Sequence, residues 1–154
     1  MRAAFLGNFS AHSSETHHAL SLESLGHSVA RLQEGRATGE QVLDEALKSD
    51  MLIVVHTHSW STPGLALDKV LLCLKGAGIP SITYHLDLWR GLQRERDLER
   101  DPFYKTIGWF FSADRLMADW FCEHTEVKGR FLPAAVFDRE CYISDQPSPH
   151  ANDV

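Results

Sequence analysis

Histidine and acidic side chains follow two neighbouring apolar runs of the chain. His56 and His58 come directly after the most apolar run, and His85 and Asp87 follow the next one. Residues two apart on an extended strand lie on one side of it, so each pair presents its two side chains together. A carboxylate two residues from a histidine can orient the ring or act as a base itself. The spacing therefore makes His85 and Asp87 candidates for acid–base chemistry.

The same residue types allow other interpretations. Two histidines at this spacing could be a zinc-ligand pair completed by His85 or Asp87. No third ligand stands at a recognisable spacing, so we expect no metal. Polar residues at strand ends also bond neighbouring loops, and Asp87 could cap a following helical segment. These structural interpretations remain open beside the catalytic one.

The loop after the first apolar run offers a second group of candidates. Gly7 permits a tight turn there, and a ligand phosphate could approach the backbone N–H of Gly7 or Asn8. The chain has neither a GxGxxG fingerprint nor a GxxxxGK[ST] loop, which disfavours dinucleotide and P-loop sites. His12 and His17 lie in the loop or first helical turn that follows, where an imidazole could serve as a base. His18 is expected to lie in a solvated turn.

These residues need a scaffold that brings strand ends together. Short apolar runs alternate with longer amphipathic segments, which is typical of an α/β protein. We expect one Rossmann-like, three-layer domain with a parallel sheet of about six strands and helices on both faces. Ligands in such sheets bind beyond the carboxyl ends of the strands. The strands are expected at 3–6, 28–32, 51–55, 80–84, 106–112 and 129–132, and the helices at 14–25, 40–48, from Pro63 to 76, and 113–124.

Length and composition limit the possible classes of protein. The 154 residues are 44% hydrophobic and 23% charged, as in an ordinary globular domain. We assign the domain to residues 1–143 and expect the Pro/Ser-rich stretch 144–154 to be a linker or disordered tail. A net charge of −6 disfavours a nucleic-acid partner. Three cysteines without a CxxC, and no apolar stretch near the roughly 20 residues of a membrane span, predict a cytoplasmic location.

Five segments together resemble one known family in their order and spacing. The segments are SSETHHALSLESLGHSVARL, SDMLIVVHTHSW, AGIPSITYHLDLW, FFSADRLMADWF and RFLPAAVFDRECY. They are similar to the N-terminal, acceptor-side domain of GT-B glycosyltransferases, in the retaining, sucrose-synthase-like group (glycosyltransferase family 4) and its phage- or spore-coat-type relatives. The chain departs from that pattern where Leu86 separates His85 from Asp87, where Ala134 and Ala135 replace Asn-Gly, and in a first loop without paired glycines.

The resemblance implies transfer of a sugar from a nucleotide-sugar donor to an acceptor hydroxyl, without metal or cofactor. It places Gly7 and Asn8 near the donor diphosphate and His85 near the transferred sugar; Asp87, the other catalytic candidate, would line the acceptor site. The nucleotide-gripping second domain has no counterpart in this sequence, which implies a separate C-terminal donor-binding domain or subunit and an isolated chain that is catalytically silent. It also matches His56 and His58 to the histidines that line the acceptor side of the cleft. The other candidates for this acceptor side of the cleft are Trp60, His12 and His17.

Two other functions are compatible with the sequence. One is a stand-alone flavodoxin-like module that binds a small molecule or nucleotide without catalysis. The other is a metal-dependent hydrolase that uses His56, His58, His85 and Asp87. A missing partner domain would also leave an apolar wall available for self-association into a homo-oligomer.

Overall fold

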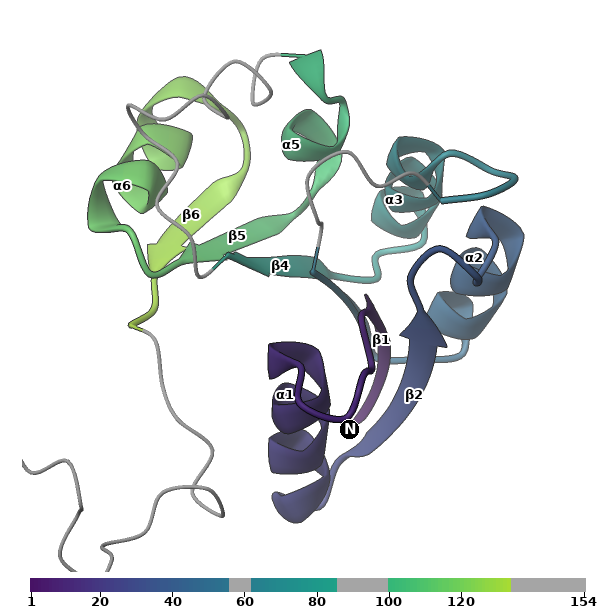
Figure 1. The fold of residues 1–154 in the computed structure, drawn as a ribbon. Helices are drawn as coiled ribbons and strands as arrows, with labels where there is room; N and C mark the ends of the chain where they lie inside the picture. The colour runs from purple at the N-terminus through teal and green to yellow at the C-terminus, as the bar shows by residue number, and fades with distance from the viewer. Residues whose placement is uncertain (56–61, 86–99, 134–154) are drawn as a thin grey trace, which may run out of the picture.

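A computed structural model describes residues 1–55, 62–85 and 100–133, which form an α/β domain around a six-stranded, all-parallel sheet (Figure 1). The strand order is β2-β1-β3-β4-β5-β6. The predicted Rossmann-like architecture is therefore confirmed. The strands are β1 (Arg2–Gly7), β2 (Ser28–Gln33), β3 (Met51–Val54), β4 (Ser81–His85), β5 (Trp109–Ser112) and β6 (Lys128–Phe131). The helices are α1 (Ser14–Ser24), α2 (Gly39–Leu47), α3 (Leu67–Gly76), α5 (Phe103–Thr106) and α6 (Arg115–His124).

Side-chain caps explain where three of the helices begin. Ser13 at α1 and Asp114 at α6 each accept hydrogen bonds from N–H groups of the first turn, which otherwise have no intrahelical partner. Thr38 and Gln41 form a reciprocal capping box at α2. After α1, Gly26 adopts a left-handed φ of +83°, which a glycine accepts without strain.

One predicted helix start is wrong. The sequence suggested that a helix opens near Pro63, whereas α3 begins at Leu67. The preceding residues instead support α2: the Pro63 carbonyl accepts from the N–H of Gly39 at 2.8 Å, and the Glu40 carboxylate accepts from the N–H of Leu65 at 3.0 Å. These tertiary bonds hold the segment in a non-helical course.

The predicted strand over 106–112 also begins later than expected. Residues 103–106 form the short helix α5, which buries Phe103 and Tyr104 against the sheet, and β5 starts only at Trp109. Between them, Gly108 donates its N–H to Ser81 Oγ at 3.0 Å. Phe103 and Tyr104 bury their large rings by packing on the sheet as part of α5 rather than by extending β5.

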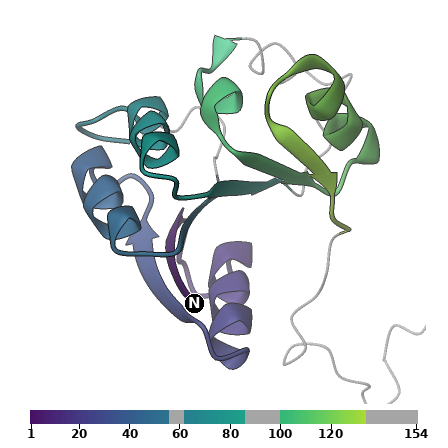
Figure 2. The same ribbon diagram turned by 180° about the vertical axis from the view of Figure 1, so that it is seen from behind.

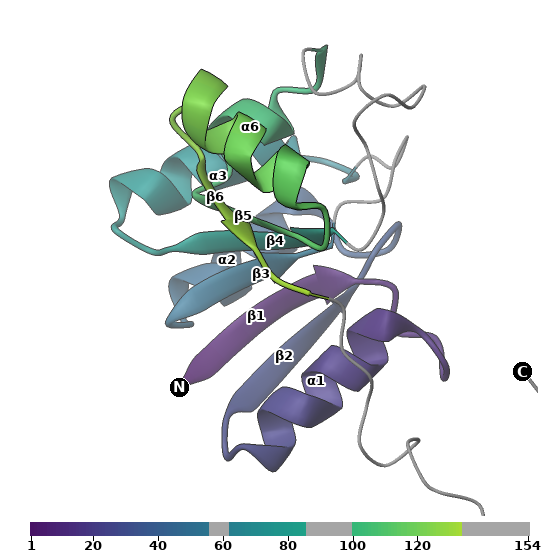
Figure 3. The ribbon, with the colours of Figure 1, turned by 90° about the vertical axis from the view of Figure 1, so that its left-hand side faces the viewer.

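The two faces of the sheet are covered unequally (Figures 2 and 3). Among the described residues, α2, α3, α5 and α6 cover one face, here called the four-helix face, while α1 alone covers part of the other, the α1 face. Alternation along β5 shows the difference, because Phe110 is fully buried on the four-helix face while Trp109 and Phe111 are only partly buried. The main core lies under the four helices and includes Leu6, Leu52, Val54, Val70, Leu71, Leu74, Tyr104, Phe110 and Phe121.

Within the described ranges, no helix is long and apolar enough to cross a membrane.

Candidate functional site

The strand order locates the most favourable ligand position. The chain runs from β1 to β2 on one side and then to β3 on the other, so the order reverses between β1 and β3. Ligands in open parallel sheets bind outside the carboxyl ends of strands at such a reversal. The ends of β1, β3 and β4 are neighbours there, which confirms that the sequence candidates follow adjacent strands. His56, His58, Trp60 and Asp87 come directly after β3 and β4 and lie outside the described residues.

His85 ends β4 and points to the four-helix face. Its side chain is 6% exposed. Its ring stacks on Phe110, with centroids 5.0 Å apart and planes 16° apart, and lies 5.9 Å from the Tyr104 ring. The catalytic candidate is therefore enclosed by aromatic rings at the carboxyl edge.

His85 belongs to a row of polar side chains on one face of β4. Ser81, Thr83 and His85 alternate along this strand, and all three are buried toward the helices. Ser81 accepts a hydrogen bond from Gly108, whereas Thr83 Oγ1 is buried with no hydrogen-bond partner among the described residues. Burying a hydroxyl without a partner is costly. Sequence reasoning missed Thr83, although the alternating polar residues of the segment SITYH were a visible signal.

Gly7 lies on the opposite face from His85, so the structure does not bring their side-chain positions together. A Cβ at Gly7 would stand 2.8 Å from Cγ of Glu15 in α1. The glycine therefore has a packing reason that involves no ligand. Glu15 is 8% exposed in the first turn of α1, where a carboxylate interacts favourably with the helix N-terminus. Its negative charge beside Gly7 disfavours a phosphate at that point.

In the loop after β1, several polar groups already form hydrogen bonds within the chain. Asn8 Oδ1 accepts from the N–H of Ser10 at 3.2 Å, and Gln33 Oε1 accepts from the N–H of Phe9 at 3.0 Å. Ser13 Oγ also donates to the Asn8 carbonyl. Phe9 and Ser10 therefore have no free N–H for a diphosphate, and a contact by Gly7 or Asn8 stays a prediction.

The histidines of the first helix separate into different environments. His12 is exposed on the loop and His17 is partly buried in α1. The prediction that His18 lies in a solvated turn is wrong, because its ring contacts Tyr84 of β4 with centroids 5.4 Å apart. Burial, and secondarily the charge of His17, lowers the pKa of His18, which favours the neutral imidazole. His18 stands three residues after Glu15, and that helical spacing was the overlooked signal.

Tyr84 connects α1 to the end of the sheet. Burial raises the pKa of Tyr84, so its phenol stays protonated at neutral pH. The hydroxyl lies 3.2 Å from the Pro133 carbonyl and 3.4 Å from that of Leu132, and it donates toward both. His18, Tyr84 and Pro133 thus form an aromatic and polar cluster on the α1 face, near the carboxyl edge.

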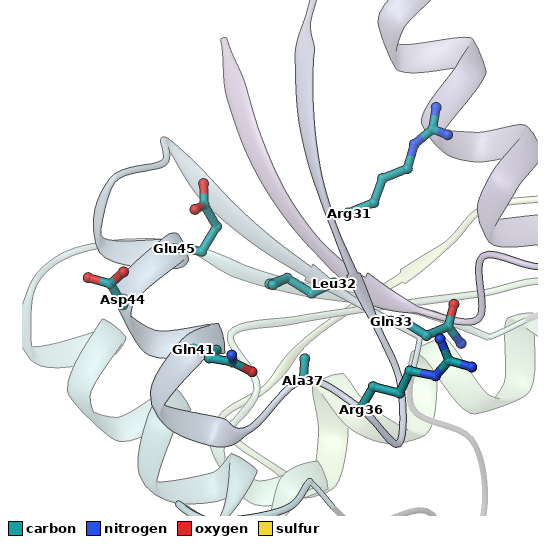
Figure 4. A pocket seen from close by; sticks show the side chains of 8 residues that line it. All are labelled: Arg31, Leu32, Gln33, Arg36, Ala37, Gln41, Asp44 and Glu45. Atoms are coloured by element: carbon teal, nitrogen blue, oxygen red, sulfur yellow. The ribbon is translucent and has the colours of Figure 1, made fainter.

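A separate open groove lies between edge strand β2 and α2, with a volume of about 460 Å³ (Figure 4). Asp44 and Glu45 line it from α2, and Arg36 lies toward its other end. No sequence candidate lies in this groove. Within the described parts of the chain, no three histidine, cysteine, aspartate or glutamate residues come close enough to hold a metal ion.

Comparisons with known proteins give little guidance. No known protein family and no curated protein matches the sequence. Among solved structures, the chain is similar to part of the pyridoxal-5'-phosphate-dependent protein YhfS from Escherichia coli, with 25% identity and a TM-score of 0.33. That alignment covers 52% of this chain and 22% of the other. At this TM-score the likeness has no bearing on function.

Proposed function

We propose that this chain is the acceptor-side domain of a GT-B glycosyltransferase, acting in the cytoplasm with a separate donor-binding domain or subunit. The observation that carries the proposal is the meeting of the β1, β3 and β4 carboxyl ends at the reversal of strand order. The regular elements also overlap the five similar segments: α1, β3 and β4 fall inside three of them, most of β2 lies in the first, and most of β5 and α6 and the second half of β6 lie in the last two. The fold alone does not specify the reaction.

In this proposal, the bond between the anomeric carbon and the donor diphosphate breaks. A new bond forms to the acceptor oxygen, and the acceptor proton passes to a base or water. His85 lies near the transferred sugar on one side of the edge, while His18 and Tyr84 belong to the wall on the α1 side. Glu15 and the occupied N–H groups of the first loop make this half a poor diphosphate site. The positive groups that stabilise the departing diphosphate belong to the donor-binding partner.

A second candidate is a stand-alone flavodoxin-like binding module. The order of the first five strands, β2-β1-β3-β4-β5, is that of flavodoxin-like folds, which bind their ligand at the β1/β3 reversal. Such a module would bind its ligand without a partner and without turnover. A partner-dependent activity separates the two candidates.

The experiment measures nucleoside diphosphate release from a panel of UDP-, GDP-, ADP- and dTDP-sugars with mixed acceptors. The chain is assayed alone and co-expressed with each reading frame that flanks its own. We expect release only from a co-expressed pair, and a strong loss of kcat in the pair that carries His85→Ala. Turnover by the chain alone would contradict the proposal, and so would silence of every pair accompanied by tight, partner-free ligand binding.

A further inference from the structure

Strand β2 forms one edge of the sheet, and among the described strands it pairs with β1 alone. Ser28 and Glu34 both donate their N–H groups to carbonyls of the β1 side, at 3.0 and 2.9 Å. Residues of a parallel ladder alternate in direction, so the N–H and C=O groups of Val29 and Arg31 point away from β1. Within the described part of the chain, these outward main-chain groups have no hydrogen-bond partner.

The side chains of β2 leave this edge accessible. Arg31 donates to the Glu23 carboxylate of α1 at 2.7 Å, and the Gln33 amide oxygen accepts from the N–H of Phe9 at 3.0 Å. Both long polar side chains are therefore held against their own subunit. No residue of β2 is buried, whereas five of the six residues of β1 are. An open edge of this kind can pair with another strand.

The groove between β2 and α2 carries opposite charges at its two ends (Figure 4). Glu45 pairs with Arg2, which lies opposite Ser28 in the strand register, so the acidic end of the groove is at the amino end of β2. Arg36 lies at the other end, just beyond the carboxyl end of β2. Among the described residues, Arg36 pairs with no carboxylate.

This order of charges is complementary to itself when reversed. A second copy of β2 that runs antiparallel along the edge brings its Arg36 to the acidic end of the first groove, and the reverse holds for the other pair of ends. Asp44 and Glu45 each use one carboxylate oxygen for Lys48 and Arg2, which leaves the second oxygen to accept from a further cation. The groove therefore fits a second copy of this chain better than a strand of uniform charge.

One register suits such a pair. With the two-fold axis at Ala30, Val29 of each copy lies opposite Arg31 of the other, and their outward groups make four main-chain hydrogen bonds. The small Ala30 side chains then meet at the axis. An axis at Arg31 would instead place two guanidinium groups directly opposite each other, which is unfavourable.

We propose that two copies of this chain pair antiparallel through β2, with the two-fold axis at Ala30, and so join their six-stranded sheets into one. Each Arg36 lies at the Asp44 and Glu45 end of the other copy's groove. Because one short strand contributes the main contact, we expect a weak dimer with a micromolar dissociation constant. The inference does not depend on the glycosyltransferase proposal, since it follows from the β2 edge and the charges of the groove.

The first test is a symmetric disulfide. Ala30→Cys is introduced into a chain in which Cys73, Cys122 and Cys141 are replaced by serine. Directly opposed residues of an antiparallel pair have Cα atoms about 4.5–5.5 Å apart, within the range of a disulfide, so mild oxidation should give a covalent dimer. Ser28→Cys lies on the same face of β2 but should give none, because its two copies would stand roughly 13 Å apart along the strands.

The second test removes the outward donor of Arg31 and keeps the pairing with β1. Proline is tolerated on an edge strand where its nitrogen faces outward, so Arg31→Pro should fold, as circular dichroism will show. It deletes two of the four hydrogen bonds between the copies and should raise the dissociation constant measured by sedimentation equilibrium about 10–100-fold. Arg31→Ala removes the same side chain but retains the N–H, and it should change the constant little.

The third test addresses the charges of the groove. Arg36→Glu should weaken the dimer severalfold, and adding Asp44→Arg should restore it, whereas Lys69→Glu on α3 should have no effect. Absence of a dimer at millimolar concentration, together with absence of the Ala30→Cys disulfide, would overturn the proposal. A dimer that is insensitive to Arg31→Pro, or one that the Ser28→Cys variant crosslinks as readily as Ala30→Cys, would place the interface elsewhere and would also overturn it. If Arg31→Pro does not fold, the two cysteine variants decide the outcome.

Discussion

The two faces of the central sheet have the same strands but different properties. On the four-helix face, Phe110 stacks on Phe121 with ring centroids 4.1 Å apart, and both side chains are fully buried. One residue away, Phe111 looks out on the α1 face and is only partly buried. The alternation of strand side chains thus lets one strand contribute to the core on one side and to an accessible surface on the other.

The difference between the two faces predicts which substitutions change the stability of the domain and which change binding or titration. The four-helix face holds the larger core, so substitutions there should mainly change the free energy of unfolding. The α1 face holds His18, Tyr84 and the partly buried Trp109 and Phe111, where substitutions should change titration or binding with smaller effects on stability. The buried polar row of β4 is the exception, because it places His85 and Thr83 within the core layer.

The largest expected effect comes from Phe110→Ala. Removing this side chain should lower the free energy of unfolding by about 3–5 kcal/mol, because it loses buried area and leaves a cavity. The matched change Phe111→Ala should cost about 1 kcal/mol, since its ring is partly exposed. Urea unfolding of the two variants measures both values. Equal losses would show that the faces are equally packed.

Glycine-to-alanine substitutions on the two faces test how closely the covering helices pack on the sheet. A Cβ at Gly129 would stand 2.1 Å from the Ala118 carbonyl oxygen of α6, whereas a Cβ at Gly7 meets the flexible side chain of Glu15. Gly129→Ala should therefore cost roughly 1–3 kcal/mol or more, because the α6 backbone must move. Gly7→Ala should cost less. Thermal unfolding measures the pair, and the reverse order would contradict the comparison.

Substitutions in the polar row of β4 should change stability less, and one of them should leave it unchanged or raise it. Thr83→Val removes a buried hydroxyl without a partner among the described residues and should leave stability unchanged or raise it by about 1 kcal/mol. Ser81→Ala removes an acceptor of the Gly108 N–H and should instead cost about 1 kcal/mol. Denaturant midpoints measure both. A clear loss of stability in Thr83→Val would mean that the hydroxyl has a partner.

The smallest expected effect is a change in the pH dependence of stability, which His18 on the α1 face should cause. Because the folded-state pKa of His18 lies below the usual value of 6.5, the unfolded chain takes up the proton first as the pH falls. The contribution of neutral His18 to stability is therefore present above pH 6.5 and is lost as the pH falls through the folded-state pKa. His18→Asn should flatten this part of the stability profile, while the exposed-loop change His12→Asn should not. An unchanged slope in His18→Asn would contradict the buried position of this ring.

The sequence predicted the architecture because hydrophobic periodicity and caps are local signals. The strand expected at 51–55 and the helices expected at 14–25 and 40–48 lie within a few residues of their observed bounds. The sequence placed the start of α3 too early because tertiary hydrogen bonds determine it. Gly39 and Glu40 of α2 bond to residues 63 and 65 just before α3, and nothing in the sequence of those residues indicates these bonds.

The candidate site was less predictable than the fold. Strand ends could be placed, but the face that each side chain occupies depends on strand registry and helix packing. Gly7 ends β1 and His85 ends β4 at the same edge of the sheet, yet they lie on opposite faces of it. His18 and Tyr84 meet only because α1 packs back toward β4, a contact between residues 66 positions apart. Glu15 also gives Gly7 a packing role that the sequence alone did not suggest.

The most direct test of the proposed function is a ¹⁵N chemical-shift map of the full chain titrated with millimolar UDP-, GDP-, ADP- and dTDP-sugars. A cleft at the reversal of strand order predicts shifts concentrated at Val55 and His85, with weak affinity in the absence of the donor-binding partner. Shifts confined to the groove between β2 and α2, or no shift with any donor, would contradict the account.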